Sequence, residues 1–123
     1  MKLILIIASV SAFIAVALGA IGAHAFKDIL VSTGKSAQFQ TASEYQWYHT
    51  IGLFVLMGLY THYGNSMFLN SAYVMLAGML LFSGSLYAYS LSGIKVFAHI
   101  TPIGGLAFLA AWAICVWGLI KVS

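Results

Sequence analysis

Few side chains in this sequence could do acid–base or ligand-binding chemistry, and Glu44 and His49 are the clearest pair among them. Glu44 is the only carboxylate close to a membrane-length apolar stretch, where an ionisable group is costly enough to suggest a function. On a helix, Tyr48 and His49 share one face with Glu44, and that face also carries an aromatic ring at Tyr45. The face suits proton handling or ligand binding, and the alternative is an interfacial aromatic belt whose carboxylate reaches headgroup water.

More polar residues extend this candidate site along the chain. His24 ends the first apolar stretch, and Thr101 begins the fourth. Ser83 and Tyr87 lie within the third. Hydroxyls in membrane helices most often bond a carbonyl one turn back or a neighbouring helix, so packing is the alternative role for Ser83. Because no nucleophile-elbow motif and no triad acid accompany this serine, we predict a protein that is not an enzyme.

The histidines, the cysteine and the lysines give no clear sign of a cofactor or a nucleic-acid partner. His24 with His49 or His99 could ligate a haem across a bundle, but no haem-attachment motif or spaced metal-ligand set accompanies them. Cys115 is alone, so it has no internal disulfide partner. The five lysines are scattered, three in the connections after the first and third stretches and two near the termini, which slightly favours cytoplasmic connections. We therefore expect no cofactor, no metal and no nucleic acid.

The elements that must position these residues are helices. Apolar stretches at about residues 3–23, 45–63, 70–91 and 100–120 are each close to the roughly 20 residues that a helix needs to cross a bilayer. With 63% hydrophobic and 6% charged residues, the chain of 123 residues cannot build a charged surface for water. We predict an all-α membrane protein with a single domain over residues 1–123, folded as an antiparallel four-transmembrane-helix bundle.

The connections between the stretches refine this prediction. In the first, the apolar residues at positions 26, 29 and 30 share one helical face and predict a short interfacial helix. A long helix is then expected over residues 36–63, and short turns follow at residues 63–66 and 92–95. Pro102 is expected in the first turn of the last span, where its missing N–H costs nothing.

The first apolar run also has features of a secretory signal. Lys2 precedes it, and Ala23-His24-Ala25 fits a cleavage site. The run is longer than the usual core of about 7 to 15 apolar residues, and another membrane segment follows it. We therefore expect the first helix to be retained.

Small residues recur at helical spacing and predict close helix packing, because in lipid close backbone approach is a main source of association. The predicted packing positions are Ala12, Ala15, Gly19 and Gly22 in the first helix, Gly84 in the third, and Gly104, Ala107 and Ala111 in the fourth. The same stripes are compatible with a homo-oligomer.

Short turns make successive helices antiparallel, so the end of the first helix, the start of the second, the end of the third and the start of the fourth meet at one membrane face. We predict a polar pocket there, lined by His24, Glu44, Tyr48, His49, Tyr87 and Thr101. Such a pocket would make the chain a binding or permeation module for a lipid headgroup, a quinone or a small solute. The alternative is a structural or assembly factor that docks another membrane protein.

Four segments carry a resemblance to a known family. Residues 18–24 (LGAIGAH), 45–49 (YQWYH), 81–87 (LFSGSLY) and 100–105 (ITPIGG) resemble the small bacterial membrane family called domain of unknown function 423. The match covers nearly the whole chain in the same order. The resemblance implies a retained first helix and a four-span protein of the bacterial plasma (inner) membrane, surrounded by membrane lipids, and it implies no activity.

Overall fold

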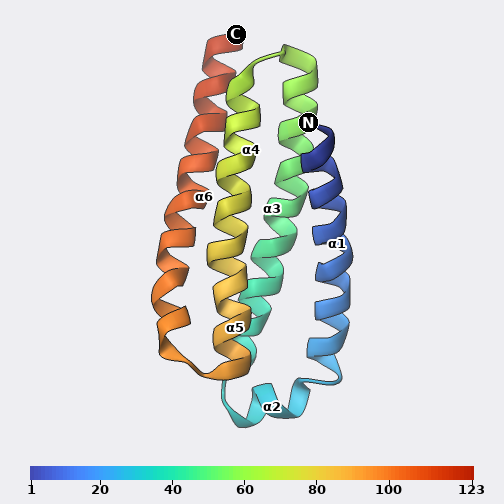
Figure 1. The fold of residues 1–123 in the computed structure, drawn as a ribbon, viewed down its shortest axis with the longest axis vertical. Coiled ribbons are helices and arrows are strands. Elements are labelled where there is room, and N and C mark those ends of the chain that lie inside the picture. Colours follow the sequence, from blue (N-terminus) through green and yellow to red (C-terminus); the bar gives the residue numbers. More distant parts are fainter.

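The computed structural model describes residues 1–123, and every regular element in it is helical. The elements are α1 (Lys2–Ala23), α2 (Lys27–Ser32), α3 (Ser36–Tyr63), α4 (Ser66–Met79), the π-helix η1 (Leu80–Gly84), α5 (Ser85–Ser92) and α6 (Lys95–Val122). Figure 1 shows α1, α3, the continuous rod of α4, η1 and α5, and α6 side by side, with α2 across one end. The prediction of an all-helical chain is confirmed, and a short helix does lie between the first two long ones.

Glycines end two of the long helices in left-handed backbone conformations, which residues with a Cβ rarely adopt. Gly64, at φ +66°, closes α3 by donating its N–H to the Tyr60 carbonyl at 2.8 Å. Asn65 then begins α4, because its side chain accepts a hydrogen bond from the Met67 N–H at 2.9 Å. Gly93, at φ +71°, closes α5 in the same way. Both turns lie where the sequence predicted them.

Three helical segments are long and apolar enough to cross a membrane, namely Lys2–Ala23, Ser66–Ser92 and Lys95–Val122. Their outward side chains are mostly apolar, and a soluble protein rarely exposes so large an apolar surface to water. Phe13 is 75% exposed and Leu80 is 76% exposed, for example. The remaining long helix, α3, is more polar, and its polar side chains Gln46 and Thr50 are buried.

The start of α6 differs from the prediction. The helix begins at Lys95 instead of near residue 100, so Pro102 lies inside it and not in its first turn. A proline removes one backbone donor, which a helix held by neighbours can tolerate. The prediction for Pro102 was wrong because it considered only the preference of proline for the first turn of a helix. In the structure, α6 packs against α4, η1 and α5 on both sides of Pro102 and stays helical.

The π-helix η1 interrupts the third apolar stretch, and the sequence pattern did not predict it. It lies where Gly104 of α6 packs directly on its backbone. A Cβ at Gly104 would overlap the backbone N of Phe82 and lie 2.6 Å from the carbonyl carbon of Leu81. Only glycine therefore allows α6 to approach η1 this closely.

The other predicted packing positions divide into two groups. Ala15 and Ala111 are buried, and a Cβ at Gly22 would overlap the Phe39 ring. The Ser71 hydroxyl also donates to the Ala111 carbonyl at 2.6 Å, which ties α4 to α6. Ala12 and Ala107 are half-buried. In contrast, a Cβ at Gly19 or Gly84 would meet nothing within 4 Å, so close packing inside the chain does not require glycine at either position.

We expect Gly104→Ala to destabilise the fold, because the added methyl group collides with backbone that cannot rotate away. The free energy of unfolding should fall by about 1 to 3 kcal/mol or more. Gly58→Ala is the matched control, since a Cβ there meets nothing within 4 Å and alanine favours the helix. Unfolding by SDS in mixed micelles measures both variants, and equal stabilities would contradict the packing described for η1 and α6.

Candidate functional site

An open groove lies between α1 and the part of the neighbouring rod that runs from the end of α4 through η1 to α5. Its volume is about 370 Å³, within the range of small-molecule sites. The groove exists because α1 packs mainly against α3 and leaves its other side free. We call it the α1/η1 groove, and its lining residues are Ile7, Val10, Ser11, Ile14, Leu18, Gln46, Leu76, Met79, Leu80, Ser83, Gly84 and Tyr87.

A polar network crosses the otherwise apolar groove. Gln46 of α3 donates through Nε2 to the Ser11 carbonyl at 3.1 Å and to the Ser11 Oγ at 3.2 Å. The Tyr87 hydroxyl donates to Gln46 Oε1 at 2.7 Å. Ser11 Oγ and Thr50 Oγ1 share a further hydrogen bond of 2.7 Å. These four residues, which we call the Gln46 network, join α1, α3 and α5 through a single amide.

Ser83 differs from the other polar residues of the groove. It belongs to η1 and lines the groove, and only 3% of its surface is exposed. Its Oγ has no hydrogen-bond partner. The groove therefore holds one hydroxyl that the protein itself does not satisfy.

His49 lies in a separate aromatic cluster between α3 and α6. Its ring stacks on Phe108 with centroids 3.5 Å apart and planes at 8°. The ring donates through Nδ1 to the Tyr45 carbonyl at 2.7 Å, and its Nε2 accepts from Trp112 Nε1 at 3.3 Å. Since a carbonyl can only accept and an indole N–H can only donate, these contacts require the neutral Nδ1–H tautomer. Both ring nitrogens of His49 are therefore hydrogen-bonded within the protein.

The remaining predicted residues do not join either group. Glu44 accepts from Gln40 Nε2 at 2.9 Å, one turn earlier on the same helix. Thr101 shares a hydrogen bond of 2.6 Å with Ser85, which ties α6 to α5. Tyr48 is 57% exposed, and His24 is exposed at the end of α1.

The six residues predicted to line one pocket therefore do not share a cavity. Tyr87 faces the α1/η1 groove, whereas Tyr45 and His49 line a different hollow of about 500 Å³ with Pro102 and Trp112. Helix ends meet at one face as expected, but the rotation of each helix turns these side chains towards different neighbours. Ligand binding by the predicted residues stays a prediction.

Tyr87 was predicted as a site residue, but the other members of the Gln46 network, namely Gln46, Ser11 and Thr50, were not. Gln46 lies inside an apolar stretch, and an amide in that position is costly enough to have been noticed as a candidate. Ser11 and Thr50 gave no such signal, because an isolated hydroxyl in a helix usually bonds its own backbone. Their role depends on the contact between α1 and α3.

The apolar outer surface, the three membrane-length helices and the paired polar groups inside define an integral membrane protein. The chain belongs to the family described as "Protein of unknown function (DUF423)", whose model matches residues 18–105. The resemblance noted in the sequence is thereby confirmed.

Two relatives cover nearly the whole chain. The UPF0382 inner membrane protein YgdD of Escherichia coli (strain K12) is 38% identical over 122 residues, which are 99% of this chain and 92% of that protein. The UPF0382 membrane protein YwdK of Bacillus subtilis (strain 168) is 36% identical over 122 residues, which are 98% of each chain. These names and the membrane-length helices confirm a multi-pass protein of the bacterial plasma (inner) membrane. No solved structure matches the chain.

We expect Gln46 and Tyr87 to be energetically coupled. In a double-mutant cycle of Gln46→Leu and Tyr87→Phe, the loss in the double variant should be smaller than the sum of the single losses. The coupling should be about 0.6 to 1.7 kcal/mol, as for hydrogen bonds between other membrane helices. Unfolding by SDS measures all variants. The matched cycle uses Tyr89→Phe, because the Tyr89 hydroxyl takes no part in the network, and equal couplings in the two cycles would contradict the assignment.

Proposed function

We propose that α3 also crosses the membrane, so that the chain is an antiparallel four-transmembrane-helix bundle with α2 at the interface. The polar side chains Gln46 and Thr50 of α3 are buried inside the protein. Its outward residues are apolar, with Ile51 56% exposed and Val55 50% exposed. Its 28 residues correspond to about 42 Å, enough to cross the roughly 30 Å hydrocarbon core.

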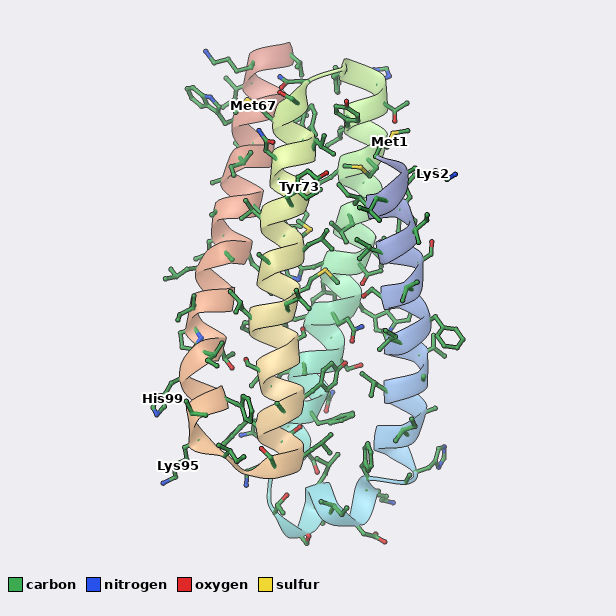
Figure 2. All side chains as sticks on the ribbon, in the orientation of Figure 1. Met1, Lys2, Met67, Tyr73, Lys95 and His99 are labelled. Atoms are coloured by element: carbon green, nitrogen blue, oxygen red, sulfur yellow. The ribbon has the colours of Figure 1, made fainter.

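Charges support the same arrangement. Figure 2 shows Lys95 and His99 projecting outwards near one end of the rods and Lys2 near the other. The end with Lys95 also carries the connections that hold Lys27 and Lys35. The other end holds Lys2 and Lys121, so an excess of three lysines over two slightly favours a cytoplasmic location for the end with Lys95.

Cysteine labelling tests whether α3 spans the membrane. In a Cys115→Ala background, Thr33→Cys precedes α3 and Ser66→Cys follows it. If α3 crosses, a membrane-impermeant maleimide added to intact spheroplasts should label only one of the two, and lysis should expose the other. Ser123→Cys is the control for sidedness and should behave as Ser66→Cys does. Labelling of both α3 positions from the same side would contradict the four-span topology.

We further propose that the chain is a binding protein for a lipid-soluble ligand, which enters the α1/η1 groove from the side. The observation that carries this proposal is the Gln46 network at the floor of an open, otherwise apolar groove. Bulk acyl chains would fill such a groove without any need for polar groups. Polar side chains within a span are costly, and they are found mostly where they bind something or hold helices together.

The chemistry of the lining favours binding over catalysis. The groove contains no carboxylate, histidine, cysteine or lysine, so it has no group suited to general acid–base or nucleophilic work near neutral pH. Its apolar walls and few polar groups resemble the composition of ordinary ligand pockets. Self-association and the docking of another membrane protein stay predictions.

Filling the groove should weaken binding without harming the fold. In Gly84→Leu the new side chain enters open space, and leucine is a better helix former than glycine. Photolabelling by an alkylbenzene that bears a diazirine should fall about tenfold, equivalent to about 1.4 kcal/mol of binding energy. Mass spectrometry of the peptides should place the label of the unmodified chain on α1 and η1.

Gly58→Leu is the matched control, because it adds the same side chain to α3 at another open position. It should leave the labelling of α1 and η1 unchanged. The proposed binding function would be wrong if both variants were labelled like the unmodified chain.

A further inference from the structure

Ser83 is an exception among the serines of its rod. The hydroxyls of Ser85, Ser90 and Ser92 each donate to a backbone carbonyl three or four residues earlier, at 2.9, 3.0 and 2.6 Å. This is the ordinary behaviour of serine in a membrane helix. The Ser83 Oγ has no partner although the residue is 3% exposed. A buried hydroxyl without a partner is uncommon and costly, and a change of the Ser83 rotamer would let a ligand in the groove supply the missing partner.

The hydrogen-bond inventory of the groove shows what kind of group is missing. The Tyr87 proton is used on Gln46, and the Gln46 amide donates to Ser11. The Ser11 and Thr50 hydroxyls share a hydrogen bond, whereas Ser83 is a groove-lining residue whose hydroxyl has no partner at all. A serine hydroxyl can both donate and accept a hydrogen bond, and its unused proton suits an acceptor on the ligand.

That acceptor is uncharged. None of the residues that line the groove is a lysine, a histidine, an aspartate or a glutamate. A phosphate or a carboxylate in the groove would thus lie unpaired in a medium of low dielectric constant, at a large free-energy cost. An uncharged carbonyl oxygen accepts a hydrogen bond from serine without that cost.

The depth of Ser83 separates two kinds of carbonyl compound. Met79 is the middle residue of the 27-residue run Ser66–Ser92, and Ser83 follows it by one helical turn, or about 6 Å. Half of the hydrocarbon core is about 15 Å thick, so Ser83 lies well inside it. The ester carbonyls of a phospholipid are tied to a headgroup at the interface. A ring that carries its own carbonyl groups on an apolar tail can lie at any depth.

We infer that the ligand of the α1/η1 groove is a lipid-soluble ring carbonyl compound of the isoprenoid quinone class, whose carbonyl oxygen accepts a hydrogen bond from Ser83. The inference rests on the proposed binding function and adds the class of ligand. The π-helix is part of this site, because Ser83 belongs to η1 and its hydroxyl does not donate to the helix backbone. The apolar tail would lie along the side chains of Ile7, Ile14 and Leu80.

Competition in nanodiscs tests the inference with two probes that differ only in their carbonyl groups. Decylbenzoquinone and decylbenzene each displace the diazirine-bearing alkylbenzene. For Ser83→Ala, the affinity for decylbenzoquinone should fall about threefold to tenfold, as expected for the loss of one hydrogen bond between uncharged groups. The affinity for decylbenzene should not change. Ser83→Ala should fold at least as well as the unmodified chain, since it removes an unpaired buried hydroxyl.

Ser90→Ala is the matched control. Ser90 is also buried in the same rod, but it bonds the Tyr87 carbonyl and does not line the groove. This variant should bind both probes as the unmodified chain does. Equal loss of quinone affinity in Ser83→Ala and Ser90→Ala would overturn the role of Ser83.

Further outcomes separate failure of this inference from failure of the proposed function. If Gly84→Leu weakens binding but Ser83→Ala binds decylbenzoquinone normally, the groove binds ligands and the carbonyl assignment is wrong. If dioctanoylglycerol displaces the probe and decylbenzoquinone does not, the ligand is an ester lipid and the ring assignment is wrong. If Gly84→Leu leaves all binding unchanged, both proposals are wrong.

Discussion

An amide inside an apolar environment must find partners for its N–H and C=O groups, and in this chain Gln46 finds them on two other helices. Its Nε2 bonds Ser11 of α1 and its Oε1 accepts from Tyr87 of α5. Because α1 packs mainly on α3, the bonds made by Gln46 are a main link between α1 and the rod of α4, η1 and α5. The bonds to Ser11 fix the position of α1 along α3. The α1/η1 groove beside the Gln46 amide stays open.

The close contact between α6 and η1 involves an element that also lines the groove. Gly104 brings the backbone of α6 against Leu81 and Phe82, in the part of the rod that has become a π-helix. π-Helical turns cost stability and occur frequently at functional sites. Here the same turn carries Ser83, whose hydroxyl has no partner. Helix packing and the polar character of the groove are therefore linked through η1.

His49 is a residue of a chemically active type whose two ring nitrogens both bond groups within the protein. Its position on one helical face with Glu44 suggested proton handling, but Glu44 bonds Gln40 and His49 bonds Tyr45 and Trp112. Periodicity correctly placed the residues on α3. Periodicity could not show which neighbouring helix Glu44 or His49 would contact. One face of a helix spans about 100° or more, so it contacts several elements once the bundle forms.

The sequence by itself determined the helical class, the membrane environment and the ends of most helices. Long apolar runs, glycines in the turns and the scarcity of charge act locally, so they can be recognised without neighbours. The start of α6 ahead of Pro102, the π-helix η1 and the partners of Gln46, His49 and Ser83 were decided only by the tertiary structure. Each depends on the rotation and distance of a second helix, which in lipid are set by close packing and interhelical hydrogen bonds between residues far apart in the chain.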